Sequence, residues 1–115
     1  MKISTEKFKN WHIIAIEGEF VVKDLVEIRV VFNSFIEEVS VKAALDLTKT
    51  NYIDSSAITS ILNFQGRLNA KSGQLVIFGP NPEVRDVFSI ISLKNSIPIY
   101  KNRYDFEAFV TEGQS

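Results

Sequence analysis

Short apolar runs alternate with amphipathic stretches along almost the whole sequence, and this alternation limits the possible folds more than any other feature. Strands are predicted where the apolar runs lie, at residues 2–8, 11–17, 40–47, 74–78 and 97–100. The intervening stretches place apolar residues three and four positions apart, which is the spacing of one helical face. Strands that alternate with helices favour a largely parallel sheet built from right-handed crossovers.

The first two predicted helices have the clearest apolar faces. The first begins near Asp24, whose charge suits the positive end of a helix dipole. Its inner face consists of Leu25, Ile28, Phe32, Phe35, Ile36 and Val39. The second helix extends from about residue 56 to residue 71, and its inner face consists of Ile58, Ile61, Leu62, Gln65 and Leu68. The glycine of Ser72–Gly73 is predicted to stop it, and residues 48–56 before it are predicted to form a polar loop.

Two further helices are predicted in the last third of the chain. Asn81 is the expected N-cap of the third helix, with Pro82 at its first helical position. The apolar face of this helix consists of Val84, Val87, Phe88 and Ile91. A closing helix is predicted around Phe106, Phe109 and Val110. Residues 111–115 are then expected to form a flexible tail.

Together these elements predict a single α/β domain over residues 1–115, with a core of about residues 2–110. The element order is β-β-α-β-α-β-α-β-α, with four helices and a mostly parallel sheet of four to five strands. Gly18 is predicted to end the second strand. Lys9–Asn10 is a plausible tight turn, so the first strand should be the antiparallel exception.

Charge and missing residue types narrow the classes of function. The 13 basic and 14 acidic residues are interspersed and leave a net charge of −1, which offers no basic face to a nucleic acid. Cysteine is absent, so neither a disulfide framework nor a thiolate metal site is expected. The first residues lack a signal-peptide pattern, and no apolar run reaches the ~20 residues of a membrane span. We therefore expect a cytoplasmic protein without a membrane span.

The sequence does not predict an enzyme. A Ser/His/Asp site would need His12, the one histidine, as its general base, and His12 lies on a predicted strand near the N-terminus. Ser55 and Ser56 are flanked by Asp54 and Ala57, whereas a nucleophile elbow has glycines at the flanking positions. The five glycines form no nucleotide-binding pattern. No cofactor and no metal site are therefore predicted.

The segment from residue 52 to residue 62 carries the strongest functional signal. Asp54, Ser55 and Ser56 stand where a loop enters the second predicted helix. Side chains of this kind commonly cap a helix, because their oxygens accept the free N–H groups of its first turn. The helix also follows a strand of a parallel sheet, so its start is expected at the carboxyl edge, where open α/β sheets bind ligands. A phosphate on a serine here would add about −1.5 to −2 charges.

This motif, Asp54-Ser55-Ser56 before an apolar helix, resembles the signature of STAS domains, as in bacterial anti-sigma factor antagonists. Other segments follow the pattern of the same family in order and spacing. They are Gly18-Glu19-Phe20, Leu45-Asp46-Leu47, Ser72-Gly73, residues 78–84 and residues 91–99. The resemblance covers about residues 2–110.

The resemblance implies a regulatory protein that binds an anti-sigma factor, which is itself a serine kinase. In that family the kinase phosphorylates the antagonist, the phosphorylated antagonist dissociates, and a phosphatase reverses the modification. Carried onto this chain, the phosphorylated residue is Ser56, with Ser55 as the next candidate. The implied partner-binding residues are Asp54, Ser55, Ser56, Thr59, Ser60 and Asn63, together with Glu19, Val21, Lys23 and Asp24 of the flanking loop.

The chain departs from the family pattern at three positions. The family usually has glycine where this sequence has Ala57 and Thr59, and those glycines leave room for close approach of a partner. Many members have an aspartate where this sequence has Val21. Thr59 is therefore expected to fill part of the docking surface, and Val21 to make its edge more apolar.

Two other functions remain open from the sequence. A small anionic ligand or a lipid head group could bind at the start of the second helix in a sensor or adaptor protein without a kinase partner. An enzyme using Ser56 or Asp54 ranks last, because a base is lacking. Four apolar residues fall partly off the predicted inner faces and would mark an interface if they cluster: Val26, Val30, Val31 and Phe64. The edge at the first strand allows either a monomer or a weak homodimer.

Overall fold

The structure of the protein is a computed structural model that describes residues 1–90 and 97–113. Six strands form its sheet: β1 (Lys2–Phe8), β2 (Trp11–Phe20), β3 (Lys42–Asp46), β4 (Thr50–Ile53), β5 (Gln74–Phe78) and β6 (Ile99–Tyr100). Four α-helices accompany them: α1 (Leu25–Ile36), α2 (Ser55–Ala70), α3 (Pro82–Ile90) and α4 (Arg103–Gly113). A short 3-10 helix, η1 (Val22–Asp24), leads directly into α1.

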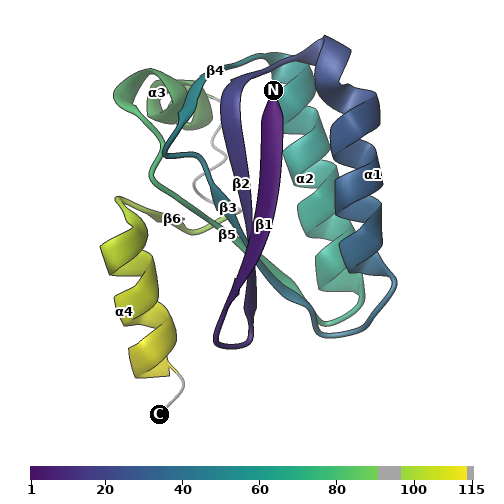
Figure 1. Cartoon of the computed structure of the whole chain (residues 1–115), viewed down its shortest axis with the longest axis vertical. Helices are drawn as coiled ribbons and strands as arrows, with labels where there is room; N and C mark the ends of the chain where they lie inside the picture. Colours follow the sequence, from purple (N-terminus) through teal and green to yellow (C-terminus); the bar gives the residue numbers. More distant parts are fainter. Residues whose placement is uncertain (91–96, 114–115) are drawn as a thin grey trace.

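The sheet confirms the predicted α/β fold. Its strands are ordered β1-β2-β3-β5-β6, and β4 also pairs with β2 (Figure 1). The β1–β2 pair is antiparallel, as predicted for the tight turn at Lys9–Asn10, and every other described pair is parallel. One strand more is present than the four to five that were predicted.

The additional strand is β4, which lies within residues 48–56, where the prediction of a loop was wrong. Its sequence Thr-Asn-Tyr-Ile contains no apolar run, so the pattern of the sequence does not reveal it. β4 forms because β2 continues past Gly18 to Phe20, and this extension pairs with Thr50–Ile53. Gly18 therefore does not end β2. It has a φ of +93° and marks a register shift within the strand, which a residue without a Cβ adopts readily.

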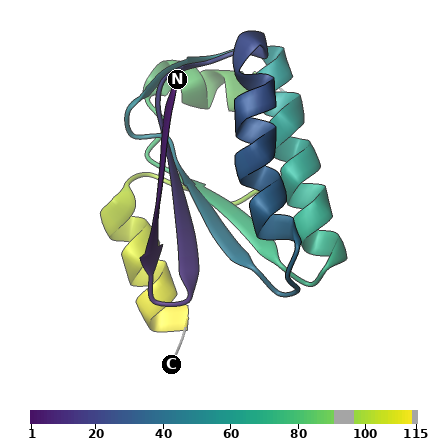
Figure 2. The same ribbon diagram turned by 45° about the vertical axis from the view of Figure 1, so that its right-hand side comes forward.

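Helices cover both faces of the sheet. Figures 1 and 2 show α1 and α2 side by side on one face and α4 on the other. Side chains of β2 alternate accordingly, since Ile14 and Ile16 join the larger core and Trp11 and Ile13 the smaller one. The smaller core under α4 is completed by Ala44, Val76, Phe78, Phe106 and Val110.

Two phenylalanines hold α1 against α2. The rings of Phe32 and Phe64 stack with their centroids 4.0 Å apart and their planes at 4°. Phe64 is only 1% exposed, so its predicted place off the inner face was wrong. Val26 and Val30, in contrast, are 73% and 68% exposed, as expected for residues outside the apolar face of α1.

The predicted start of the third helix is confirmed, whereas Val39, expected on the inner face of the first helix, lies beyond the end of α1 and is 72% exposed. The side chain of Asn81 caps α3 by accepting the N–H of Val84 at 2.8 Å, and Pro82 is its first residue, as predicted. Ile91, expected on the face of α3, lies outside the described residues. α4 continues to Gly113, so residues 111–113 are helical where a flexible tail was expected, and residues 114 and 115 lie outside the described part.

The end of α2 depends on two neighbouring residues in different ways. Ser72 has a φ of +62°, so the left-handed turn falls on the serine of the predicted Ser72–Gly73 stop. Gly73 is needed for space, because a Cβ there would lie 2.4 Å from the carbonyl oxygen of Val41. The backbone just before β3 thus approaches the end of α2 too closely for any side chain at position 73.

We expect Gly73→Ala to lower the free energy of unfolding by about 1–3 kcal/mol, the usual range for forced overpacking. The measurement is urea denaturation followed by circular dichroism. Ser72→Gly is the matched control and should leave stability unchanged or higher, because glycine adopts a positive φ without strain. Equal stability of Gly73→Ala and the wild type would contradict the close approach.

An ion pair ties α4 to the edge strand. Arg103 Nη1 lies 2.8 Å from Glu6 Oε1, and Arg103 Nε lies 2.7 Å from Glu107 Oε2. The hydrogen bond from Arg103 lowers the pKa of Glu6 below its ordinary value. A carboxylate with a lowered pKa stabilises the folded state above its unfolded pKa, and this contribution disappears as the pH falls through the folded pKa.

We expect Glu6→Gln to reduce stability at pH 7 by about 0.2–1 kcal/mol, since both partners are exposed and screened by solvent. The difference from the wild type should vanish at an acidic pH below the lowered pKa of Glu6, where the carboxylate is protonated. Thermal unfolding at the two pH values measures it. A difference that persists in acid would show that packing, and not charge, is responsible.

Candidate functional site

Asp54 organises the start of α2. It is the N-cap of the helix, and its Oδ1 accepts the N–H of Ala57 at 2.9 Å. Its Oδ2 accepts the N–H of Val22 at 3.0 Å, across 32 positions of the sequence. One carboxylate therefore satisfies a free N–H of the helix and also fixes η1 beside it.

The loop beside this helix start has its own internal acceptor. Asp24 is 7% exposed, and its Oδ2 accepts the N–H of Val21 at 3.0 Å. This carboxylate holds the loop in shape and is almost completely buried. Its burial argues against the predicted contact of Asp24 with a partner. The other predicted loop contacts are accessible: Glu19 and Lys23 are exposed and Val21 is half-buried.

The two serines occupy the first turn of α2 in different environments. Ser55 is exposed, and its carbonyl oxygen accepts the Thr59 hydroxyl at 3.0 Å. Ser56 is half-buried and lines a groove between α1 and α2. Its hydroxyl has no hydrogen-bond partner among the described residues.

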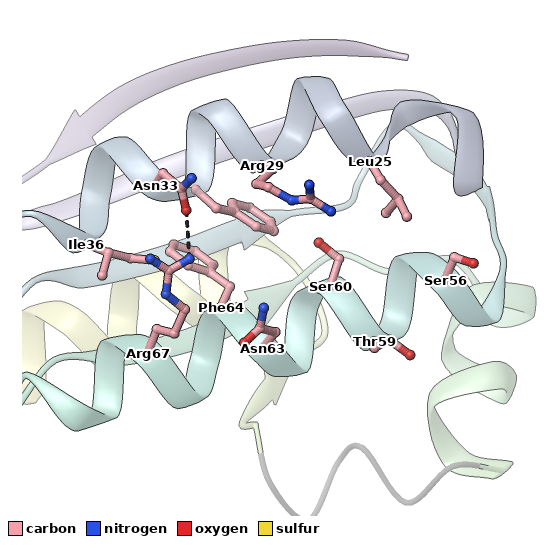
Figure 3. A pocket seen from close by; sticks show the side chains of 11 residues that line it. Leu25, Arg29, Asn33, Ile36, Ser56, Thr59, Ser60, Asn63, Phe64 and Arg67 are labelled. Atoms are coloured by element: carbon pink, nitrogen blue, oxygen red, sulfur yellow. Dashed lines mark hydrogen bonds between the residues drawn. The ribbon is translucent and has the colours of Figure 1, made fainter.

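The groove, which we call the α1–α2 groove, has a volume of about 230 Å³ (Figure 3). The side of α1 contributes Leu25, Arg29, Phe32, Asn33 and Ile36. The side of α2 contributes Ser56, Thr59, Ser60, Asn63, Phe64 and Arg67. The stacked rings of Phe32 and Phe64 are buried between the helices, and polar side chains surround them.

The structure brings the predicted contacts on α2 together. Ser56, Thr59, Ser60 and Asn63 all line the α1–α2 groove. The Ser60 hydroxyl points toward the opposite helix, whereas the Thr59 hydroxyl points away from it (Figure 3). These four residues share one side of α2 because they are three and four positions apart.

Sequence reasoning missed the cationic residues of the groove. Arg29 extends from α1 toward Ser60, and Arg67 Nη1 donates to Asn33 Oδ1 at 2.7 Å (Figure 3). Arg29 follows Leu25 by one turn and Arg67 follows Asn63 by one turn, so each lies in register with a groove residue. That spacing was visible in the sequence, but the pairing of the two helices was not.

The residues that replace the family's glycines have separate effects. Ala57 is fully buried, so its methyl group joins the core and does not narrow the surface. Thr59 is exposed and adds a side chain to the rim of the groove. Only Thr59 therefore occupies space that a partner would approach.

The position of His12 excludes it as the general base of a Ser/His/Asp site at Ser56. His12 is paired with Ala43 near the amino end of β2, while Phe20 at the other end of β2 pairs with Ile53. His12 and Phe20 are eight strand positions apart, which corresponds to about 26 Å. His12 cannot act as a base for Ser56.

The described residues contain neither a metal-binding cluster nor a membrane-spanning helix. In residues 1–90 and 97–113, no three His, Asp or Glu side chains are placed to hold a metal ion. Over the same ranges, every helix is too short or too polar to cross a bilayer.

Comparison with known families settles the identity of the fold. The model of the STAS domain family matches residues 2–106, nearly the whole chain. The chain belongs to the STAS domain family. Its Asp54-Ser55-Ser56 motif thus stands at the helix start where the resemblance placed it.

Individual relatives of this STAS domain are distant in sequence. BtrV of Bordetella bronchiseptica, a proposed anti-sigma factor antagonist, is 23% identical over 103 residues, which cover 90% of this chain and 89% of the relative. An anti-sigma factor antagonist domain from Planctomyces limnophilus has a TM-score of 0.83 at 14% identity, with 92% and 95% of the two chains covered.

SpoIIAA from Bacillus, solved in its phosphorylated form, has the same fold. Its TM-score is 0.71 at 19% identity, and the match covers 93% of this chain and 98% of SpoIIAA. At such identities the likeness to solved structures shows a shared fold.

We expect Asp54→Ala to destabilise this STAS domain by about 1–3 kcal/mol, because it leaves the N–H groups of Val22 and Ala57 without their acceptor. Hydrogen exchange should accelerate at these two amides first. Asp54→Asn should lower the free energy of unfolding by less, since its one amide oxygen can still accept one N–H. Asp86→Ala on exposed α3 is the control and should stay within about 0.5 kcal/mol of the wild type. Unchanged exchange at Val22 would contradict the bridging role of Asp54.

Proposed function

We propose that this STAS domain is an anti-sigma factor antagonist that binds a kinase-type anti-sigma factor through the start of α2. Phosphorylation of Ser56 releases the partner, and a phosphatase restores binding. The domain itself performs no catalysis in this scheme. The domain is the substrate of the kinase, and it also competes for the binding surface of that kinase.

The observation that carries this proposal is the state of the Ser56 hydroxyl. It lies on the wall of an open groove, half-buried, and no described residue hydrogen-bonds to it. A kinase can therefore transfer the γ-phosphoryl group of ATP to Ser56 Oγ without unfolding the helix. The Oγ proton leaves, the new O–P bond forms, and ADP departs.

The added charge would act on the partner more than on the domain. A phosphate brings about −1.5 to −2 charges, which the positive start of α2 tolerates. Asp54 is already engaged by two backbone N–H groups and has no need to move. A carboxylate or an apolar side chain of a docked partner, in contrast, would be repelled or left in contact with a charged group.

The named neighbours support this function. BtrV is a proposed anti-sigma factor antagonist. SpoIIAA bears the same designation and is known in unphosphorylated and phosphorylated forms with this fold. Both forms match the present chain, which fits a switch that changes surface charge and preserves the fold.

A second candidate is a sensor or adaptor that binds a small anionic ligand or a lipid head group without a kinase. The guanidinium groups of Arg29 and Arg67 in the α1–α2 groove favour it. A thermal-shift screen with anionic metabolites tests this candidate, because a ligand of the native state raises the melting temperature.

We expect incubation with the kinase-type anti-sigma factors of the source cell and ATP to add one phosphate, located on Ser56 by intact mass and peptide mapping. Ser56→Ala should bind the same partner and accept no phosphate. Ser56→Asp should bind at least about tenfold more weakly, from like-charge repulsion and desolvation.

Ser89→Asp is the control for added charge, because Ser89 is exposed on α3 away from the groove. It should bind as the wild type does. A phosphate on Ser55 would assign the switch to the neighbouring serine, and a Ser56→Asp variant of full affinity would refute charge gating.

A further inference from the structure

The charge of the α1–α2 groove is not explained by a phosphorylation switch alone. None of the lining residues that the structure describes carries a carboxylate, although the chain has more acidic than basic residues. Arg29 and Arg67 provide two guanidinium groups, and Ser60 and Asn63 of α2 add a hydroxyl and an amide group to the same groove. The groove is thus a local cationic surface on a nearly neutral protein.

These cations form a row along the two helices. Arg67 donates to Asn33, which is one turn beyond Arg29 on α1, so the α1 residues at these two levels are separated by a helical rise of about 6 Å. Lys71 Nζ continues the row by donating to the carbonyl oxygen of Ile36. Arg67 and Lys71 are held by these bonds, while Arg29 has no charged partner among the described residues.

The length of the groove favours a chain segment over a single small anion. It is lined from Leu25 to Ile36 on α1, a helical distance of about 16 Å. One phosphate or carboxylate would occupy a single level of this row. A peptide that carries acidic side chains one turn apart could contact both arginines.

An apolar strip borders the row on the outer side of α1. Val26, Val30 and Asn33 follow one another at spacings of four and three, so the two valines continue the side of the helix that Asn33 occupies. They are 73% and 68% exposed. A segment lying in the groove would cover them with its own apolar side.

We propose that the α1–α2 groove binds an acidic amphipathic segment of a protein partner. Its carboxylates contact Arg29 and Arg67, and its apolar side covers Val26 and Val30. This inference rests on the proposed function for the nature of the partner and specifies the chemistry of the contact. Ser56 lies at one end of the same groove, so a phosphate there would repel the acidic segment directly.

The test uses a synthetic helical peptide of about 14 residues with glutamates four positions apart and leucines along one side. We expect it to shift the NMR signals of the Arg29 and Arg67 guanidinium groups and of the Asn63 side-chain amide. Arg29→Gln with Arg67→Gln should weaken binding about fivefold, as two exposed ion pairs allow. Higher salt should weaken binding to the wild type.

Matched controls separate this contact from general charge attraction. Arg85→Gln, on exposed α3, should bind the peptide as the wild type does. A peptide with glutamine in place of each glutamate should bind more weakly to the wild type and equally to the double variant. Equal affinity of the two peptides for the wild type, or signals that shift only outside the groove, would overturn the proposal.

Two further measurements show whether the groove binds a small anion or a peptide, and whether peptide binding is separate from phosphorylation of Ser56. Inorganic phosphate that matches the peptide in affinity and shifted signals would show a small-anion site and overturn the segment. The double variant Val26→Ser with Val30→Ser should bind the peptide more weakly than the wild type does. Its response to inorganic phosphate should stay the same. These readouts need no kinase, so peptide binding without phosphorylation of Ser56 refutes only the switch, and phosphorylation without peptide binding refutes only the groove.

Discussion

The two hydrogen bonds of the Asp54 carboxylate are the contact on which the functional surface depends. They join the start of α2 to the residue that opens η1, which lies far away in the sequence. Both acceptors belong to one short side chain, so neither segment can shift without breaking a bond to the other. Ser55 and Ser56 are presented on a fixed helix turn for this reason, and α1 begins from a fixed point beside them.

β4 provides the second constraint at this edge. Its pairing with the last residues of β2 places Ile53 beside Phe20, so the chain reaches Asp54 directly from the sheet. Thr50 strengthens this junction, because its buried hydroxyl donates to the carbonyl oxygen of Ile16 at 2.6 Å. The short strand β4, which contains no apolar run, thus positions the start of α2.

The alternation of apolar runs and helical faces predicted most of the fold, because each element buries a side large enough to show in the sequence. Asn81 and Pro82 were identified as a helix start from chemistry that is local to them. β4 was missed because its stability comes from pairing with β2 across a register shift, which is a property of two distant segments. Phe64 was placed off the core since its partner Phe32 lies on another helix.

The residues of the candidate site also differ in whether they could be predicted from one element alone. Ser56, Thr59, Ser60 and Asn63 could be assigned to one side of α2 because helical spacing depends only on that helix. Arg29 could not be assigned, since it belongs to the groove only through the packing of α1 on α2. Asp24 was expected to contact a partner, but its side chain is buried. That burial depends on how the loop folds, which the sequence pattern does not show.

The stacked rings of Phe32 and Phe64 have a consequence for how such proteins can diversify. They help to set the distance between α1 and α2. A rim residue that is exposed and hydrogen-bonds only within its own helix, such as Thr59, can therefore change while this packing is kept. Gene duplicates built on this scaffold can drift apart at the rim until each recognises its own regulator, and several such pathways can then coexist in one cell without cross-talk.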